Sequence, residues 1–337
     1  MGMEQLIKEK ALELGYEKCG IIPIQYMEGY DDILYNRMEK VPASKPFYQR
    51  QERLTKLTEK YPWAKSVIVT VSHYGHYKIP KHLEGHIAKL YLFDGRVNEE
   101  SMEYRQSEGM EEFLQGLSLK TLSERKFGLV GMRWAAMKAG LGIVRRNNFF
   151  YTESGSWVEL EAWITDRDME LIETPRLQEC PKGCSNCMKA CPTCSLSEPY
   201  TMNPMSCISF LTTFGGRNME HEERAKELGP WIYGCDACPM NHKKWKEEDE
   251  FPHEDEMLSM LTPENIMRMD EDYYKIHIQP KFFYLTPDDL WKWKINVLNF
   301  MNNNYLESYG QFIMEACEHK NEKISEFAKK IAVELGI

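Results

Sequence analysis

Apolar residues follow two different spacings along the first half of the chain. Helical spacing is seen over residues 3–15, 99–122 and 132–139, and glycine ends the first and the last of these stretches. Strand patterns occur over residues 18–24, 66–71 and 157–165, the second as a β-branched run long enough for a buried strand. We therefore predict an α/β (α+β) domain that ends near residue 175.

The second half has a different pattern. Residues 243–256 are highly charged, with seven acidic residues in 247–256, which predicts a solvated linker or loop. Beyond it, apolar residues return at helical spacing over residues 290–302 and 310–335, which predicts a small helical unit. The expected organisation is a domain at 1–175, a cysteine-rich domain at 176–245, and a linker with a helical C-terminal unit at 246–337.

Charge and hydropathy restrict the possible partners. The 337 residues include 42 Lys and Arg against 52 Asp and Glu, a net charge of −10 that repels phosphate backbones unless basic residues gather on one face. The longest apolar runs, such as residues 67–71, are too short to cross a bilayer, and the charged first ten residues do not resemble an export signal. We expect a cytoplasmic protein that does not bind membranes.

Eight of the ten cysteines lie between positions 180 and 238, a stretch that we call the cysteine segment. Its first four cysteines have the spacing C-x3-C-x2-C-x3-C-P, one residue longer than the bacterial ferredoxin run C-x2-C-x2-C-x3-C-P. The cysteine before proline in two-cluster ferredoxins binds the other cluster, so we expect Cys191 to join a distant set. The segment thus predicts two [4Fe–4S] clusters, one of them held by Cys191, Cys207, Cys235 and Cys238.

The other cluster has only three ligands that the spacing identifies. Cys180, Cys184 and Cys187 supply three ligands, and the nearest candidates for the fourth are Cys194, which we prefer, and His242. Two structural zinc sites are an alternative, because both C-x2-C pairs have zinc-knuckle spacing. The four-cysteine run ending in Cys-Pro argues against zinc, and no strand leads into Cys191-Pro-Thr-Cys194 as a thioredoxin-type dithiol would require.

A second candidate site follows the helical stretch at 132–139. Gly140 and Gly142 form a glycine turn, and Arg146 and Asn147 come directly after it. Such a turn can hold a phosphate-bearing cofactor through backbone and side-chain donors. The alternative is a helix C-cap followed by an exposed basic turn, and the residues alone leave both open.

Three sets of motifs resemble one known family. Residues 184–193, 206–212 and 232–238 are similar, in order and spacing, to the ferredoxin domain of the epoxyqueuosine reductases. Upstream, residues 62–69, 139–142, 155–157 and 165–166 resemble the corrinoid-binding domain of that family. Residues 271–274 and 294–303 look like a shortened form of its C-terminal HEAT-like helices, so the resemblance covers nearly the whole chain.

The resemblance implies a fold and cofactors. It implies a nitroreductase-like corrinoid-binding domain, a ferredoxin-like double-cluster domain and a short HEAT-like helical unit. Family members bind cobalamin beside two [4Fe–4S] clusters and remove the epoxide oxygen of a modified base in a transfer RNA anticodon, and related corrinoid reductases dehalogenate organic halides. The residues that the resemblance assigns to cobalamin are Gly140, Gly142, Arg146, Asn147, Ser156 and Thr165.

Two departures from the family pattern affect the expected reaction. The last cysteine motif lacks its final cysteine, through a deletion or with His242 at that position. The family's catalytic aspartate should fall near residues 126–128, where this chain reads Arg125-Lys-Phe-Gly-Leu129 without a carboxylate. Reductive deoxygenation still needs a proton donor, for which Tyr104 or a histidine such as His73 are candidates.

From these features we expect an oxidoreductase, a cobalamin-dependent iron–sulfur reductase that acts on a substrate the sequence does not identify. Because of the acidic balance and the missing aspartate, we expect a small molecule rather than transfer RNA as that substrate. Two alternatives remain: an electron-transfer or corrinoid-reducing partner protein without its own substrate, and an epoxyqueuosine reductase acting on transfer RNA. The electron donor should be a low-potential protein such as ferredoxin or flavodoxin.

Overall fold

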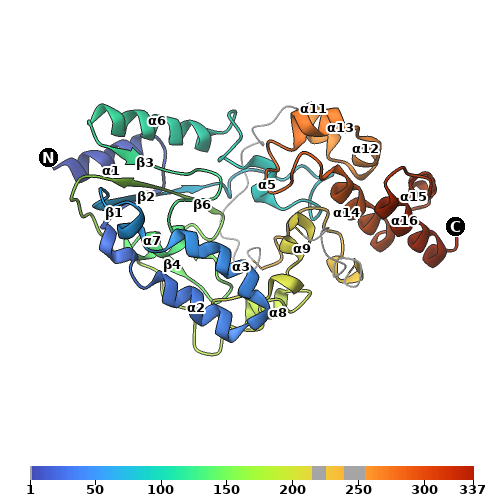
Figure 1. The fold of residues 1–337 in the computed structure, drawn as a ribbon, viewed down its shortest axis with the longest axis horizontal. Helices are drawn as coiled ribbons and strands as arrows, with labels where there is room; N and C mark the ends of the chain where they lie inside the picture. Colours follow the sequence, from blue (N-terminus) through green and yellow to red (C-terminus); the bar gives the residue numbers. More distant parts are fainter. Residues whose placement is uncertain (1, 215–224, 239–254) are drawn as a thin grey trace.

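A four-stranded antiparallel sheet forms the centre of the N-terminal half. The computed structural model describes residues 2–214, 225–238 and 255–337. In the sheet order β1-β2-β6-β3, Ile21 of β1 faces Ile68 of β2, and Val69 of β2 faces Ala162 of β6. This arrangement confirms the expected fold class in its α+β form (Figure 1). The strands are β1 (Lys18–Pro23), β2 (Ser66–His73), β3 (Thr121–Leu122) and β6 (Val158–Thr165).

Helices cover both faces of this sheet (Figure 1). On one face, Ile68 and Trp163 pack under α1 and α6, and on the other, Val69 and Ala162 pack under α7. The alternation follows from strand geometry, in which successive side chains point to opposite faces. The helices are α1 (Met3–Glu13), α6 (Met102–Gly116) and α7 (Met132–Lys138).

Shorter elements surround this core. The sequence pattern did not predict α2, α3 and α4, because their apolar residues are few. Those of α2 and α3 form a small separate core around Tyr30, Leu34 and Tyr48, and α4 contributes only Leu57 to the core under the sheet. A two-stranded hairpin follows α7. These elements are α2 (Tyr30–Lys40), α3 (Lys45–Gln49), α4 (Leu57–Lys60), β4 (Ile143–Val144) and β5 (Phe150–Tyr151).

The cysteine segment lies between the sheet domain and the C-terminal helices (Figure 1). It contains α8 (Asn186–Ala190) and α9 (Ile208–Phe214). The side-chain amide of Asn296 in the helical unit contacts this segment. Its Nδ2 donates to Thr212 O at 2.8 Å and to Ile232 O at 2.9 Å. The segment is therefore joined to the helices by buried hydrogen bonds as well as by packing.

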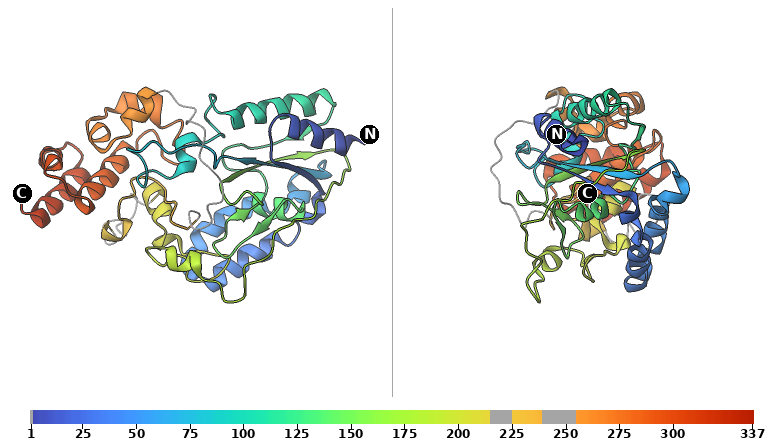
Figure 2. Two further views of the ribbon diagram at one scale, coloured as in Figure 1. Left: turned by 180° about the vertical axis from the view of Figure 1, so that it is seen from behind. Right: turned by 90° about the vertical axis from the view of Figure 1, so that its left-hand side faces the viewer.

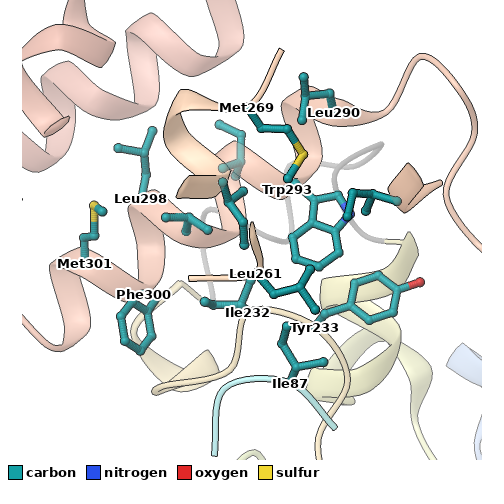
Figure 3. Packing of buried hydrophobic residues seen from close by; sticks show 14 of the residues in the cluster. Ile87, Ile232, Tyr233, Leu261, Met269, Leu290, Trp293, Leu298, Phe300 and Met301 are labelled. Carbon is teal, nitrogen blue, oxygen red and sulfur yellow. The ribbon is translucent and has the colours of Figure 1, made fainter. Parts of the chain in front are cut away.

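The C-terminal helices enclose the largest apolar core of the described residues (Figure 3). Trp293 stacks on Tyr233 with ring centroids 5.3 Å apart, and Figure 3 shows both among aliphatic side chains. The stretch predicted as one helix over residues 310–335 is two helices, because Asn321 caps the second by accepting from Lys323 N. The helices are α11 (Asp255–Met260), α12 (Pro263–Arg268), α13 (Glu271–Tyr273), α14 (Leu290–Asn303), α15 (Gly310–Cys317) and α16 (Glu322–Leu335).

One part of the N-terminal half belongs structurally to this core. Residues 74–93, including α5 (Lys89–Phe93), pack with the C-terminal helices through Leu83, Ile87 and Leu92, and Figure 2 shows α5 beside them. The domain boundaries at 175 and 245 stay predictions. Among the described residues, no helix is both long and apolar enough to span a bilayer.

Candidate functional site

Four thiols come together between α8, α9 and the loop after residue 231. Burial raises the pKa of Cys235 to about 12 and that of Cys238 well above its usual value, and the neighbouring thiols of Cys207 and Cys191 raise both. Burial also raises the pKa of Cys207, with Cys191 again among the neighbours. The structure thus groups Cys191, Cys207, Cys235 and Cys238, the set expected for one cluster.

Three further thiols form a second group at the start of the segment. Burial raises the pKa of Cys187, and the thiols of Cys180 and Cys184 raise it again. Cys194 is exposed, has a left-handed φ of 53°, and is not among the thiols that influence either group. The other candidate for the fourth ligand, His242, lies outside the described residues.

The two thiol groups fit iron–sulfur clusters better than zinc. Buried thiols that raise one another's pKa are poor free thiolates, and bound iron would supply the compensating positive charge. A single zinc ion needs its ligands within about 2.0–2.3 Å of one point. Across residues 2–214, 225–238 and 255–337, no three His, Cys, Asp or Glu side chains gather around one point in that way. Each cysteine of a [4Fe–4S] cluster binds a different iron, so its thiolates stand further apart.

Asp236 anchors the second pair of cysteines to α5. Its carboxylate accepts from the backbone amide of Lys89 at 2.7 Å, and burial raises its pKa to about 7 although that amide and the Lys89 charge oppose the shift. Lys89 is itself fully buried and donates from Nζ to Gly75 O at 2.8 Å. These bonds hold the thiols of the loop at a defined distance from the residue 74–93 region.

The glycine turn at 140–142 is filled by the protein's own chain. A Cβ on Gly140, whose φ is +72°, would lie 1.7 Å from Glu173 O, and a Cβ on Gly142 would lie 2.2 Å from Tyr151 O. Both glycines are thus required for close backbone packing. Their assignment to cobalamin rests on the resemblance and stays a prediction.

The side chains after the turn form a polar network beside the cysteines. Asn147 Nδ2 lies 2.8 Å from the Tyr151 hydroxyl, and burial raises the pKa of Tyr151 to about 12 against the opposing bonds of Asn147 and Ser156. The Cys238 thiol is close enough to raise this pKa as well. Sequence reasoning missed Tyr151, which stood in the pattern only as one aromatic residue after a turn.

The neighbouring arginine approaches the cysteine segment from the same loop. Arg146 O accepts from Tyr200 N at 2.9 Å, and the buried Nε atoms of Arg145 and Arg146 have no hydrogen-bond partner among the described residues. Guanidinium N–H groups without a partner fit an anionic cofactor group such as a phosphate. Arg146, Asn147 and Ser156 therefore lie in one region, as the predicted cobalamin site requires.

Thr165 lies outside this region. It stands opposite Ser66 at the far end of β6, nine residues from Ser156, which is about 30 Å of extended strand. The structure therefore does not bring Thr165 together with the other predicted cofactor residues.

The two weak candidates for the proton donor are placed differently. Burial lowers the pKa of His73 to about 4, and the charges of His76 and Lys89 lower it further, so His73 is neutral at pH 7 and a poor proton donor. Tyr104 lies on α6 with the Arg125 guanidinium 4.4 Å from its ring centroid.

The loop that replaces the family's aspartate has one carboxylate nearby. Glu124 accepts from the backbone amides of Lys126 at 3.0 Å and Phe127 at 2.7 Å. This partly buried carboxylate caps the loop. The structure thus offers no free acid within the loop itself.

Carboxylates gather instead in a pocket that sequence reasoning missed, between α6, β6 and this loop. Its lining includes Glu103, Glu159 and Glu161 together with Arg96 and Arg125. Strand alternation could have located part of it, because Glu159 and Glu161 precede Trp163 on the face of β6 that packs under α6.

Comparison with known proteins gives one family model and many relatives. The model "4Fe-4S double cluster binding domain" matches residues 179–241. An epoxyqueuosine reductase of Cellulophaga algicola is 28% identical over 291 residues, which cover 80% of this chain and 89% of the relative. One of Bacillus subtilis is 35% identical over 142 residues, which cover 40% of this chain and 36% of the relative.

Solved structures agree in fold over nearly the whole chain. A selenomethionine-labelled epoxyqueuosine reductase superposes with a TM-score of 0.79 at 20% identity, covering 98% of this chain and 89% of its own. Another, solved with an epoxyqueuosine-modified tRNA-Tyr stem loop, has a TM-score of 0.73 at 18% identity and covers 99% of both chains. The suspected relationship is confirmed.

These findings contradict the expectation of a small-molecule substrate. Proteins matching this chain are named for a reaction on a transfer RNA base, and one was solved with the modified stem loop. The expectation was wrong because net charge does not report local potential. Seven acidic residues are confined to 247–256, so the rest of the chain is close to neutral.

Proposed function

Since this chain belongs to the epoxyqueuosine reductase-like family and is an iron–sulfur oxidoreductase, we propose that it reduces epoxyqueuosine in a transfer RNA anticodon stem loop. The observation that carries the proposal is the combination of two thiol groups with this fold on one chain. The relatives' names supply the reaction, and the structure solved with a modified stem loop supplies the substrate class.

Two [4Fe–4S] clusters and cobalamin are the proposed cofactors. When bound, they supply low-potential electrons and a reduced cobalt centre for breaking the carbon–oxygen bonds of the epoxide. Arg146, Asn147 and Ser156 would hold the corrinoid beside Tyr151, because these side chains lie in one region next to Cys238. A low-potential ferredoxin or flavodoxin is the proposed electron donor.

The protein's own residues join the cluster segment to the rest of this site. Phe214, at the end of α9, contacts the ring of Tyr284 at 5.1 Å, and the Tyr284 hydroxyl accepts from Arg96 Nη1 at 3.2 Å. Arg96 lines the carboxylate pocket and also donates to Lys126 O at 3.1 Å. This junction of three parts of the chain is where we propose that the modified base is reduced.

The proposal is tested with anaerobically purified protein that has been reconstituted with iron, sulfide and cobalamin. A chemically reduced sample is mixed with a stem loop carrying epoxyqueuosine, and the released nucleosides are analysed by mass spectrometry. We expect a product that has lost one oxygen atom, and no change in a stem loop carrying unmodified guanine. Fully loaded, reduced protein that leaves the epoxide intact would overturn the proposal.

One observation favours a second function. Lys126 stands where the resemblance places the family's catalytic aspartate, so the chain could reduce a corrinoid on a partner protein without its own substrate. In that case the reduced protein would transfer electrons to a separate corrinoid protein and leave the stem loop unchanged.

A further inference from the structure

The carboxylate pocket is the part of the molecule that the proposed cofactors do not explain. It lies between α6 and β6 and is lined by Glu103, Glu159, Glu161, Arg96 and Arg125. It opens beside the loop at 124–128, since Arg96 reaches Lys126 O and Arg125 belongs to the loop's first turn. Its acidic groups therefore lie close to the proposed junction.

Glu103 points one oxygen into this pocket without a hydrogen bond. Its side chain is 3% exposed, and Oε2 accepts from the Tyr77 hydroxyl at 2.9 Å. Oε1 has no hydrogen-bond partner, and His76 Nε2 lies 3.7 Å from it. Burying a carboxylate oxygen that has no hydrogen bond costs free energy of folding unless the oxygen carries a proton or contacts a ligand.

Glu159 approaches Glu103 from the strand. Its Oε1 is also buried without a hydrogen bond, 3.4 Å from Arg96 Nε. A Cβ on Gly95 would lie 2.6 Å from Glu103 Cβ and 2.8 Å from Glu159 Oε2, so glycine at position 95 leaves room for both side chains. Burial raises the pKa of Glu159 well above its usual value, with Asp94 and Glu103 adding to the shift against Arg96.

The cations of the pocket are shared among more acids than they can balance. Arg96 donates to both oxygens of Asp94 at 2.7 Å, and Arg125 Nε lies 3.9 Å from Glu161. Glu161 also accepts from the hydroxyls of Tyr16 and Ser107. Two guanidinium groups thus face four carboxyl groups, and the two with the fewest bonds are those of Glu103 and Glu159.

We propose that the pocket lined by Glu103 and Glu159 holds a proton at neutral pH and serves as the proton store for the reductive step, in place of a carboxylate in the 124–128 loop. The inference rests on the proposed function. Two electrons pass from an external low-potential donor through the clusters, both carbon–oxygen bonds of the epoxide break, and a carbon–carbon double bond forms. The oxygen leaves as water with two protons, one from the glutamate pair, which is reprotonated from solvent.

The test uses the loaded holoenzyme with E103Q and E159Q. Glutamine resembles a protonated glutamate in shape and charge, so both variants should fold and retain iron. The matched control is E111Q on the same helix, whose carboxylate accepts from Trp163 Nε1 at 2.6 Å outside the pocket. The first readout is the carbonyl stretch of protonated carboxyl groups in pH-difference infrared spectra, and the second is the pH profile of single-turnover stem-loop reduction.

We expect both pocket variants to lose a carboxyl band that the wild type and E111Q retain. Reduction should slow by about 10²–10⁴-fold, and the fall in rate on the alkaline side of the pH profile should disappear, as for removal of a general acid. E159D, which retains an acid, should recover part of the rate.

The outcomes separate the inference from the function on which it rests. Unchanged bands in both variants, or an unchanged pH profile in an active enzyme, would overturn the proton store. A wild type that shows the band but does not reduce the epoxide would overturn the proposed function. The use of the stored proton in this reaction would be overturned with it, whereas the presence of the stored proton would be established.

Discussion

In the C-terminal helical unit, large side chains such as Trp293, Tyr274 and Phe282 are almost completely buried in one continuous apolar core. In residues 180–207, by contrast, the buried apolar side chains are those of Cys187, Leu196 and Pro204. The helical unit gains its stability from apolar burial, whereas residues 180–207 of the cysteine segment have little apolar surface to bury. The order of these residues must depend on metal ligation, as in other small metal-binding modules.

Electrostatics sharpens this comparison. In the cysteine segment, burial and neighbouring thiols raise the pKa of Cys235 and Cys238, so without iron these thiols stay protonated and their thiolates depend on the positive charge of bound iron. In the helical unit, the buried charge of Lys292 is paired with Asp289 at 2.7 Å. The cysteine segment should therefore lose order when metal is lost, and the helical unit should lose stability when its packing or charge is changed.

The largest effect is expected for C207S. Cys207 belongs to the more completely grouped set of four thiols, so its loss should remove one cluster, about four irons of eight. Stem-loop reduction should fall more than about 100-fold, because ligand loss exceeds the usual 10–100-fold cost of changing a second-shell residue. Iron and sulfide analysis, with electron paramagnetic resonance of the reduced protein, measures this. Undiminished iron would contradict the assignment, and C317S, far from the cysteine segment, is the control.

The next largest effect distinguishes the two candidates for the missing ligand. The spacing C-x2-C-x3-H of Cys235, Cys238 and His242 repeats that of Cys184, Cys187 and Cys191. Because the last ligand of such a run binds the other cluster, we expect H242A to perturb the first cluster and C194S to retain about eight irons. The spectrum of H242C should approach that of an all-cysteine cluster. Loss of iron in C194S alone would restore Cys194 as the ligand.

The helical unit should respond to W293A without losing iron. Trp293 is 1% exposed and packs on Tyr233 and Phe282, so truncation should cost about 3–5 kcal/mol of unfolding free energy. Urea unfolding followed by circular dichroism measures the loss. The control is W291A, because Trp291 is only partly buried and contacts Lys323 at the surface. Equal losses in both variants would show that burial does not set this stability.

The smallest effect is expected for D289N, and it should depend on pH. Burial raises the pKa of Asp289, but hydrogen bonds from Lys292 and from the Thr286 amide outweigh it, so the pKa lies below its usual value. Its stabilisation is present above the unfolded pKa of about 3.9 and is lost as pH falls through the lower folded value. D289N should lose about 1.5–3 kcal/mol at pH 7.

The pH dependence supplies the check on this last prediction. Urea unfolding of D289N and wild type is compared at pH 7 and at progressively lower pH, and the difference should shrink in the acid range. D288N, next to it and exposed, is the control and should leave stability nearly unchanged. A difference that stays constant with pH would mean that the ion pair does not contribute.

The pattern of apolar residues predicted the central strands and α14 because these elements are long and regular. It missed α2 and α3, whose few apolar residues form a small local core, and α4, which buries only Leu57. It also missed the break at residues 318–321, because apolar spacing continues on both sides and only the Asn321 cap marks the second helix. Whether a segment forms a helix or a strand was thus predictable where one face of that segment is buried along its whole length.

The candidate site was predictable to the extent that its ligands are local in the chain. The first three thiols lie within eight residues, and their spacing alone indicates a cluster. Thr165 was assigned to the cofactor by resemblance, but the register of β6 places it far from Ser156. A motif identifies residues by their order along the chain, whereas the length of the extended strand between them decides which residues lie close together.

The sequence by itself determined that this protein has two iron–sulfur ligand sets, because short cysteine spacings bring thiolates together without a large core. The sequence also indicated that Cys191, Cys207, Cys235 and Cys238 form one of these sets, whereas only the tertiary structure decided that Tyr151 links the glycine-turn loop to Cys238. The same holds for the nearness of Glu103 to Glu159, which are 56 positions apart and line one pocket because α6 packs on the face of β6 that carries Glu159. Contacts of that kind depend on sheet register and helix packing, which no local pattern of residues encodes.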